Sequence, residues 1–178
     1  MIRTSAFVAT SIDGFIARED GNLDWLDHYS TIAADDTSYR EFVSTIDVIV
    51  MGRNTYEKVL KFDFWPYEGT PVKVLSTTLT SVSPELAERV EIMSCSPKEL
   101  LEQLEAQSFR HAYIDGGKTI QSFLRVGMLD ELTLTRIQIL LGQGIPLFGP
   151  LDHDVPLKLV KSKNLPWGFV QSHYKVLK

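Results

Sequence analysis

Short hydrophobic runs alternate with polar, glycine-bearing breaks along most of the chain. Each run is four to six residues long and rich in β-branched side chains, which is typical of buried strands rather than helices. We therefore predict strands at residues 6–9, 48–51, 71–75, 90–93, 112–115 and 132–137. Two longer alternating runs, 157–163 and 169–176, are joined by a loop with Pro166 and Gly168 and predict a closing antiparallel hairpin.

Helical patterns separate these strands. Asp35 or Asp36 can cap a helix through residue 43, and Asn54 or Thr55 can cap one through about residue 60. Residues 96–99 read Ser-Pro-Lys-Glu, a helix start that predicts a helix to about residue 107. Strands interleaved with helices and followed by a hairpin indicate an α/β fold in one domain, residues 1–178, with a mostly parallel sheet and an antiparallel end.

Residues 48–57 form the stretch around which the chain is organised. The strand runs through Gly52 into a helix start, and such a turn leaves backbone N–H groups free at the end of a sheet. The free N–H groups and the positive end of the helix suit a phosphate, to which Arg53 can add two hydrogen bonds and Thr55 a hydroxyl. The alternative is an ordinary strand–helix turn with a surface arginine.

Residues 112–120 repeat the same strand–glycine–helix logic. Gly116 and Gly117 allow backbone conformations that other residues avoid and let a ligand come close. The stretch is not a P-loop, because Ala112 stands where that pattern requires glycine. The dinucleotide fingerprint G-x-G-x-x-G is missing here, and residues 142–147 also fail it because Leu147 replaces the third glycine.

Several loop residues carry two interpretations. Asp13, in an Asp-Gly turn, can orient a ligand or bond its own turn backbone. Trp25 can line a cleft or belong to the core. The aromatic loop 62–67 can cover a ligand or close one end of the core, and we favour the second. Ser76 and Thr77 follow a buried strand, where hydroxyls can bond a phosphate or ribose or simply cap the strand end.

Composition narrows the class of protein. The chain has 44% hydrophobic and 23% charged residues, as soluble globular proteins do, and its net charge of −5 argues against a general nucleic-acid surface. A single cysteine, Cys95, excludes an intramolecular disulfide and a multi-cysteine metal site, and the four histidines have no metal-ligand spacing. No apolar run is long enough to span a membrane and none resembles a signal peptide, so we expect a cytoplasmic protein.

Five stretches in this order give the chain a resemblance to the dihydrofolate-reductase-like superfamily. The nearer branch contains the reductase domain of the bifunctional riboflavin-biosynthesis deaminase-reductase. The stretches are SIDGFIA (11–17), MGRNTYE (51–57), IDGGKT (114–119), DELTLT (130–135) and GQGIPLF (142–148). Each motif is weak alone, and the resemblance covers roughly residues 2 to 176. It implies a three-layer α/β fold.

The resemblance also implies that NADPH binds along the carboxyl ends of the sheet. It assigns cofactor contacts to four groups of residues. These are Gly52, Arg53 and Thr55 at the phosphates, Ser76 and Thr77 near the adenosine 2′-phosphate, Gly116, Gly117, Lys118, Thr119 and Ile120 at the pyrophosphate, and Val8 and Ala9 beside the nicotinamide. The deaminase half, with its zinc ligands, is missing from this sequence.

The chemistry that the resemblance implies is hydride transfer to a C=N or C=O carbon of a small pterin-like, pyrimidine-like or carbonyl compound. Asp13 and Thr135 are the candidate catalytic residues. The acidic residue that faces the pterin in dihydrofolate reductase has no clear counterpart here. A nucleotide-binding module used for sensing or assembly is therefore the alternative function. Members of the family this size pair through the sheet edge or hairpin, which implies a homodimer.

Overall fold

The computed structural model describes residues 1–26 and 37–178. Its first half contains β1 (Arg3–Thr10), β2 (Phe15–Ala17), α2 (Ser38–Val43), β3 (Val48–Gly52), α3 (Arg53–Val59), β4 (Val72–Leu75), η1 (Pro84–Leu86) and β5 (Val90–Met93). Its second half contains α4 (Pro97–Ala106), β6 (His111–Asp115), α5 (Gly117–Arg125), β7 (Glu131–Arg136), β8 (Ile145–Pro146), β9 (Leu157–Asn164), η2 (Pro166–Gly168) and β10 (Val170–Val176).

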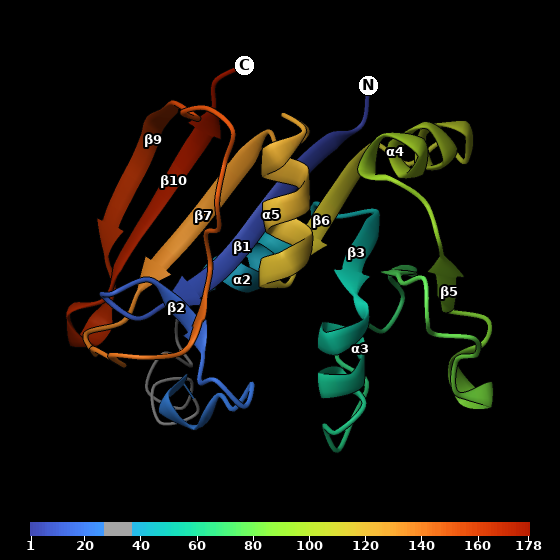
Figure 1. The fold of residues 1–178 in the computed structure, drawn as a ribbon, viewed down its shortest axis with the longest axis horizontal. Coiled ribbons are helices and arrows are strands. Elements are labelled where there is room, and N and C mark those ends of the chain that lie inside the picture. Colours follow the sequence, from blue (N-terminus) through green and yellow to red (C-terminus); the bar gives the residue numbers. More distant parts are fainter. Residues whose placement is uncertain (27–36) are drawn as a thin grey trace.

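Eight strands form one sheet in the order β5-β4-β3-β6-β1-β7-β10-β9 (Figure 1). The five pairings from β5 to β7 are parallel, and the two pairings of β10, with β7 and with β9, are antiparallel. The predicted α/β fold with a mostly parallel sheet and an antiparallel hairpin is confirmed. The small antiparallel pair of β2 and β8 is a feature that the sequence did not predict.

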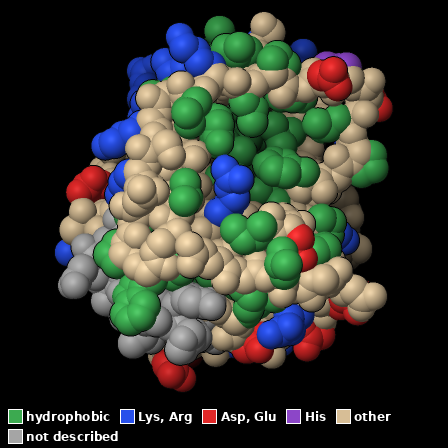
Figure 2. Space-filling model, turned by 90° about the vertical axis from the view of Figure 1, so that its left-hand side faces the viewer, with side chains coloured by type: hydrophobic (Ala, Val, Ile, Leu, Met, Phe, Trp, Pro, Cys, Tyr) green, Lys and Arg blue, Asp and Glu red, His purple; other side chains and the backbone are tan. Residues whose placement is uncertain are grey.

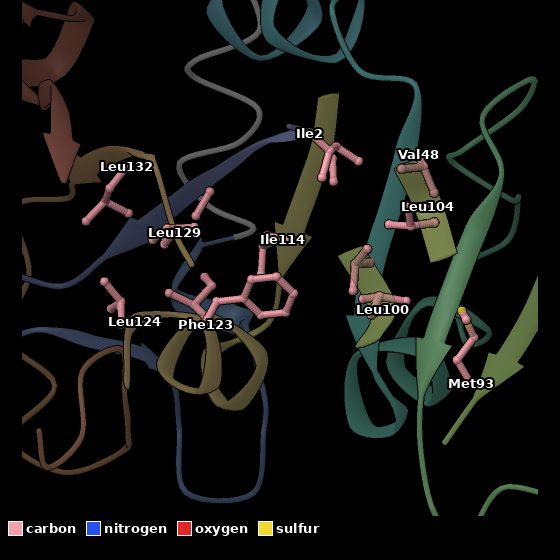
Figure 3. Packing of buried hydrophobic residues seen from close by; sticks show 14 of the residues in the cluster. Ile2, Val48, Met93, Leu100, Leu104, Ile114, Phe123, Leu124, Leu129 and Leu132 are labelled. Carbon is pink, nitrogen blue, oxygen red and sulfur yellow. The ribbon is translucent and has the colours of Figure 1, made fainter. Parts of the chain in front are cut away.

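The helices cover the two faces of the sheet and give the three layers. On one face α4 and α5 contribute Leu100, Leu104 and Phe123 to a cluster with Val50 and Ile114 of the strands (Figure 3). On the other face residues of α2 and α3 pack against strand residues in a second cluster; its helix members are Phe42, Tyr56 and Val59. Alternate residues of β3 and β6 enter the two clusters, because successive side chains of a strand point to opposite faces.

The two faces follow from the direction of the crossovers. The connections β3–α3–β4 and β6–α5–β7 start from neighbouring strands. The first runs toward the β5 edge of the sheet, and the second runs toward the β9 edge. Since parallel crossovers are right-handed, opposite directions place α3 and α5 on opposite faces. The loops therefore part between the carboxyl ends of β3 and β6, which is the position where open α/β sheets bind ligands.

Local sequence signals decide most helix ends, with one correction. Ser96 and Glu99 form the predicted capping box of α4, in which the hydroxyl of Ser96 accepts from the Glu99 N–H. The predicted caps of α3 are wrong: its N-cap is Gly52, so Asn54 and Thr55 lie inside the first turn. The extended backbone of Gly52 continues the strand directly into the helix. The N-cap of α2 is Thr37, and the predicted caps Asp35 and Asp36 lie outside the described residues.

Candidate active site at the carboxyl ends of strands 3 and 6

A cavity of about 780 Å³ opens where the loops part. This volume lies within the range of small-molecule and cofactor sites. Its walls come from the loop around β2, from one side of α3, from the start of α5 and from β8. The lining residues used below are Glu19, Asp20, Gly52, Arg53, Thr55, Glu57, Lys58, Lys61, Phe62, Tyr67, Asp115, Gly116, Gly117, Lys118 and Thr119.

The two glycine turns interlock at the floor of this cavity. A Cβ atom on Gly116 would lie 2.2 Å from Oγ1 of Thr55, and a Cβ atom on Gly52 would lie 3.0 Å from Oγ1 of Thr119. Each glycine therefore makes room for a threonine of the opposite turn. Gly116 also has φ of +86°, a conformation that residues with a Cβ rarely adopt. The glycines thus bring the two helix starts together, in addition to any approach of a ligand.

The first turns of α3 and α5 present backbone N–H groups toward this region. Neither N-cap, Gly52 or Gly116, carries a side-chain capping bond within the described chain. Uncapped N–H groups at the start of a helix can donate hydrogen bonds to the oxygen atoms of an anion. With Arg53 and Lys118 on the same wall, the floor of the cavity fits the phosphates of a dinucleotide.

Arg53 is half-exposed at the rim and already has partners. Its Nη1 donates to Oγ1 of Thr78 at 2.8 Å, and its Nε lies 3.0 Å from a carboxylate oxygen of Glu57, one helical turn later. These contacts leave part of the guanidinium fork available and fix its direction. The other charged residues on the wall include Lys58, Lys61, Lys118, Glu19 and Asp20.

Asp115 is a residue of the site that the sequence analysis missed. It ends β6, and its carboxyl accepts from the Gly116 N–H at 2.7 Å and from the hydroxyl of Tyr67 at 3.4 Å. Burial raises the pKa of Asp115, and the bonds from Gly116, Tyr113 and Tyr67 oppose that rise only in part. A polar residue at the end of an apolar strand run, just before two glycines, was the signal available in the sequence.

The predicted cofactor residues divide into three groups. Seven of the twelve lie on the cavity wall: Gly52, Arg53, Thr55, Gly116, Gly117, Lys118 and Thr119. Val8, Ala9 and Ile120 contribute to the hydrophobic clusters instead. Ser76 and Thr77 lie beyond the wall, where the hydroxyl of Ser76 accepts from the N–H groups of Thr78 and Leu79 and closes its own turn.

The two predicted catalytic residues lie away from the cavity wall. The carboxylate of Asp13 accepts from the N–H groups of Leu141 and Gly142, at 3.2 and 2.8 Å, and so ties two loops together. A hydrogen bond from Ser11 lowers the pKa of this exposed carboxyl, as do the two backbone bonds. Thr135 is buried, and its Oγ1 accepts from Nε2 of Gln171 at 3.0 Å.

The remaining open interpretations are decided by packing. Trp25 is 4% exposed and packs with Ile137 and Phe169, so it belongs to the core. In the aromatic loop, Trp65 packs against the core, as the favoured interpretation expects, and Phe62 lines the cavity. Among the described residues no cluster of His, Cys, Asp or Glu could hold a metal ion, and no helix there is long and apolar enough to cross a bilayer.

The family model of the RibD C-terminal domain matches residues 5–170 of this chain. The chain belongs to the RibD C-terminal domain family. This family includes reductase domains of riboflavin biosynthesis, which agrees with the resemblance stated above and supports a reductase-like protein.

Relatives and solved structures agree with this family. The uncharacterized protein YwjB of Bacillus subtilis (strain 168) is 32% identical over 174 residues, which cover 97% of each protein. The crystal structure of a protein from Shewanella sp. PV-4, named as a putative riboflavin biosynthesis protein, has a TM-score of 0.93 and 39% identity. The match covers 99% of this chain and 100% of that one.

A more distant structure supports the fold. The Thermotoga maritima diaminohydroxyphosphoribosylaminopyrimidine deaminase/5-amino-6-(5-phosphoribosylamino)uracil reductase has a TM-score of 0.72 and 16% identity. The alignment covers 99% of this chain and 57% of that bifunctional protein. At this identity the likeness concerns the fold alone, the dihydrofolate-reductase-like arrangement of the RibD C-terminal domain.

Proposed function

We propose that this protein is an NADPH-dependent reductase of a small heterocyclic or carbonyl compound. The observation that carries the proposal is that one cavity is lined both by Arg53, in a cationic glycine turn, and by the partly buried carboxyl group of Asp115. The first suits the phosphates of a dinucleotide, and the second suits proton delivery to a reduced heteroatom. Membership of the RibD C-terminal domain family supports a reductase of this general kind.

The interlocked turns are the residues that would hold the cofactor. The first turns of α3 and α5 direct N–H groups to one place, and Arg53 and Lys118 add positive charge beside them. When bound, NADPH supplies a hydride for transfer to a C=N or C=O carbon. The protein contributes the orientation of the two reactants and the exclusion of water from the space between them.

We assign the role of proton donor to Asp115. Reduction of a C=N or C=O bond adds a hydride to carbon and a proton to nitrogen or oxygen, and the donor must be protonated at neutral pH. Burial raises the pKa of Asp115 and favours its neutral form, whereas hydrogen bonds lower the pKa of Asp13 and favour its carboxylate. After the transfer Asp115 is left as a carboxylate and regains a proton from water.

The test is NADPH oxidation by the purified protein with panels of pterin, pyrimidine and carbonyl compounds. We expect turnover with at least one compound class, and Asp115→Asn should abolish most of it. If NADPH binds but is not oxidised with any panel, the alternative function follows: a nucleotide-binding module for sensing or assembly on the same fold. Absence of both binding and turnover would reject the two functions together.

A homodimer is a second part of the proposal. Strand β9 is an edge strand with exposed apolar side chains at Leu157, Leu159 and Val160, and Figure 2 shows hydrophobic side chains gathered on this side of the molecule. Long apolar edges are protected in most proteins, often by pairing. Light scattering should give twice the chain mass for the wild type and a lower mass for Leu159→Lys. A monomeric wild type would refute the dimer.

A further inference from the structure

The carboxyl group of Asp115 lies within a group of tyrosines whose hydroxyls converge on it. Tyr67 reaches it from the loop after α3, and Tyr113 reaches it from the same strand two residues earlier. Tyr39 of α2 lies behind Tyr113, with their ring centroids 6.5 Å apart. Asp115 and Tyr67 also line the cavity, whereas Tyr39 and Tyr113 do not.

Tyr67 is held in place by a ladder of aromatic rings. Its ring centroid is 5.4 Å from that of Trp65, and Trp65 is 6.4 Å from Tyr56, both in edge-to-face geometry. Tyr56 and Tyr67 are 1% and 8% exposed, so neither can turn freely into solvent. The loop that contacts the ligand cavity is thereby fixed in a position where the Tyr67 hydroxyl donates to Asp115.

Tyr113 is held equally firmly, and its hydroxyl has two acceptors within reach. Its ring packs edge-to-face on Phe42 with a centroid distance of 5.0 Å. Its hydroxyl donates to the carbonyl oxygen of Phe7 at 3.0 Å, and the carboxyl group of Asp115 is a second acceptor close enough to affect its pKa. A phenol has one proton to donate, so ionised Asp115 competes with the carbonyl for it, whereas protonated Asp115 does not.

The charges around Asp115 are unevenly distributed. On the sheet side, the titratable groups that act on it within residues 1–26 and 37–178 are the phenols of Tyr39, Tyr67 and Tyr113. Burial and the neighbouring Asp115 carboxyl raise the pKa values of Tyr67 and Tyr113. Tyr39 is 43% exposed, and its pKa is also raised rather than lowered, so all three phenols stay neutral. On the cavity side the charged lining groups are Glu19, Asp20, Arg53, Glu57, Lys58, Lys61 and Lys118.

We propose that Tyr67 and Tyr113 are positioning residues that hold Asp115 at the cavity wall and tune its acidity through their hydroxyls. The inference rests on the proposed function in which Asp115 delivers the proton. Each hydroxyl stabilises the carboxylate that remains after the proton has left. Neither residue needs to touch the reacting atoms, and Tyr113 lies behind the cavity wall.

The test compares Tyr67→Phe and Tyr113→Phe with the matched control Tyr56→Phe. Tyr56 is buried in the same cluster, but its hydroxyl accepts from the Ser83 N–H, away from Asp115. The carboxyl carbon of Asp115 is titrated by NMR in aspartate-labelled protein, with its signal assigned through Asp115→Asn. We expect the titration of Asp115 to move to higher pH in both test variants and to stay unchanged in Tyr56→Phe.

The rate profile gives the second readout. If Asp115 is the acid, the alkaline limb of kcat should move to higher pH with the NMR titration, so that each test variant keeps more of its maximal rate at alkaline pH. An NMR titration that does not move in either variant would overturn the tyrosine proposal, whatever the activity. An NMR shift without a matching change in the rate profile would support the tyrosine contacts and instead reject Asp115 as the acid of the proposed reaction.

Discussion

The two glycine turns share a backbone plan but present opposite chemistry to the same cavity. The turn after β3 offers Arg53, half-exposed and permanently charged, on the helix side of Gly52. The turn after β6 offers Asp115, held by Tyr67 and Tyr113, on the strand side of Gly116. Each turn is completed by a threonine from the other, so the pair forms one unit.

The difference shows that position relative to the glycine decides the environment of the side chain. A residue before the glycine is the last residue of a buried strand, so its side chain points into the layer between sheet and helix. A residue after the glycine begins the helix, where the side chain faces outward and stays hydrated. Burial of the first favours a neutral acid, and exposure of the second keeps a charge available for a phosphate.

The largest expected effect comes from removing the acid of the β6 turn. Asp115→Asn keeps the shape of the side chain but cannot give a proton, and general acid catalysis contributes about 10²- to 10⁴-fold to a rate. We expect kcat to fall within that range, with the NADPH dissociation constant nearly unchanged. Asp13→Asn, the matched variant outside the cavity wall, should keep most of the activity. If Asp13→Asn lowered kcat more than Asp115→Asn does, Asp13 rather than Asp115 would be the catalytic residue.

The next effect concerns the interlock between the turns. Gly116→Ala places a methyl group against Thr55 and forces alanine to a positive φ, so the free energy of unfolding should drop by about 3 kcal/mol or more. Gly127→Ala is the control, because Gly127 also has a positive φ but open space around its Cβ position. That variant should lose only about 1 kcal/mol. If chemical denaturation gave equal losses of unfolding free energy for the two variants, the contact between Gly116 and Thr55 would not contribute to stability.

The raised pKa of Asp115 predicts a pH-dependent stability. A carboxyl whose pKa is higher in the folded than in the unfolded state stabilises the fold below its unfolded pKa, and this stabilisation is lost as pH rises through its folded pKa. Asp115→Asn removes the ionisation. Compared with wild type, the variant should therefore gain in Tm from acidic to alkaline pH. A Tm difference that is constant from pH 4 to pH 9 would contradict the burial of this carboxyl.

The smallest effect comes from the partner of Arg53. Glu57→Gln removes a charge that pairs with the guanidinium and faces the same cavity. Exposed pairs of this kind are worth about 0.2–1 kcal/mol, so NADPH should bind about 1.4- to 5-fold more tightly, with little change in Tm. Glu85→Gln, in the short helix far from the wall, is the control. Weaker binding in Glu57→Gln would show that Glu57 orients Arg53 rather than competing for it.

The sequence predicted the strands and the two glycine turns because those signals are local. Apolar runs, the capping box at Ser96 and the glycines each act within a few residues, and the structure has the elements where they were expected. The start of α3 was misplaced because Asn54 and Thr55 are good caps by type, whereas the chain enters the helix directly from Gly52.

The arrangement around Asp115 could not be predicted because it depends on distant residues meeting. Tyr39, Tyr67 and Tyr113 come from three separate segments, and their phenols act on the carboxyl only in the folded chain. The same holds for Asp13, whose partners at Leu141 and Gly142 lie far along the sequence. No local sequence pattern distinguishes an aspartate that links two loops, such as Asp13, from one that is held as a protonated acid, such as Asp115.

Calorimetric titration shows whether the interlocked turns bind NADPH. NADPH and NADH are titrated separately into the wild type, Arg53→Ala and the control Arg125→Ala, which changes an arginine in the last turn of α5. We expect micromolar binding of NADPH to the wild type and the control, weaker binding of NADH, and about 10- to 100-fold weaker NADPH binding to folded Arg53→Ala. Unchanged NADPH affinity in Arg53→Ala, or binding of neither nucleotide to the wild type, would contradict NADPH binding at these turns.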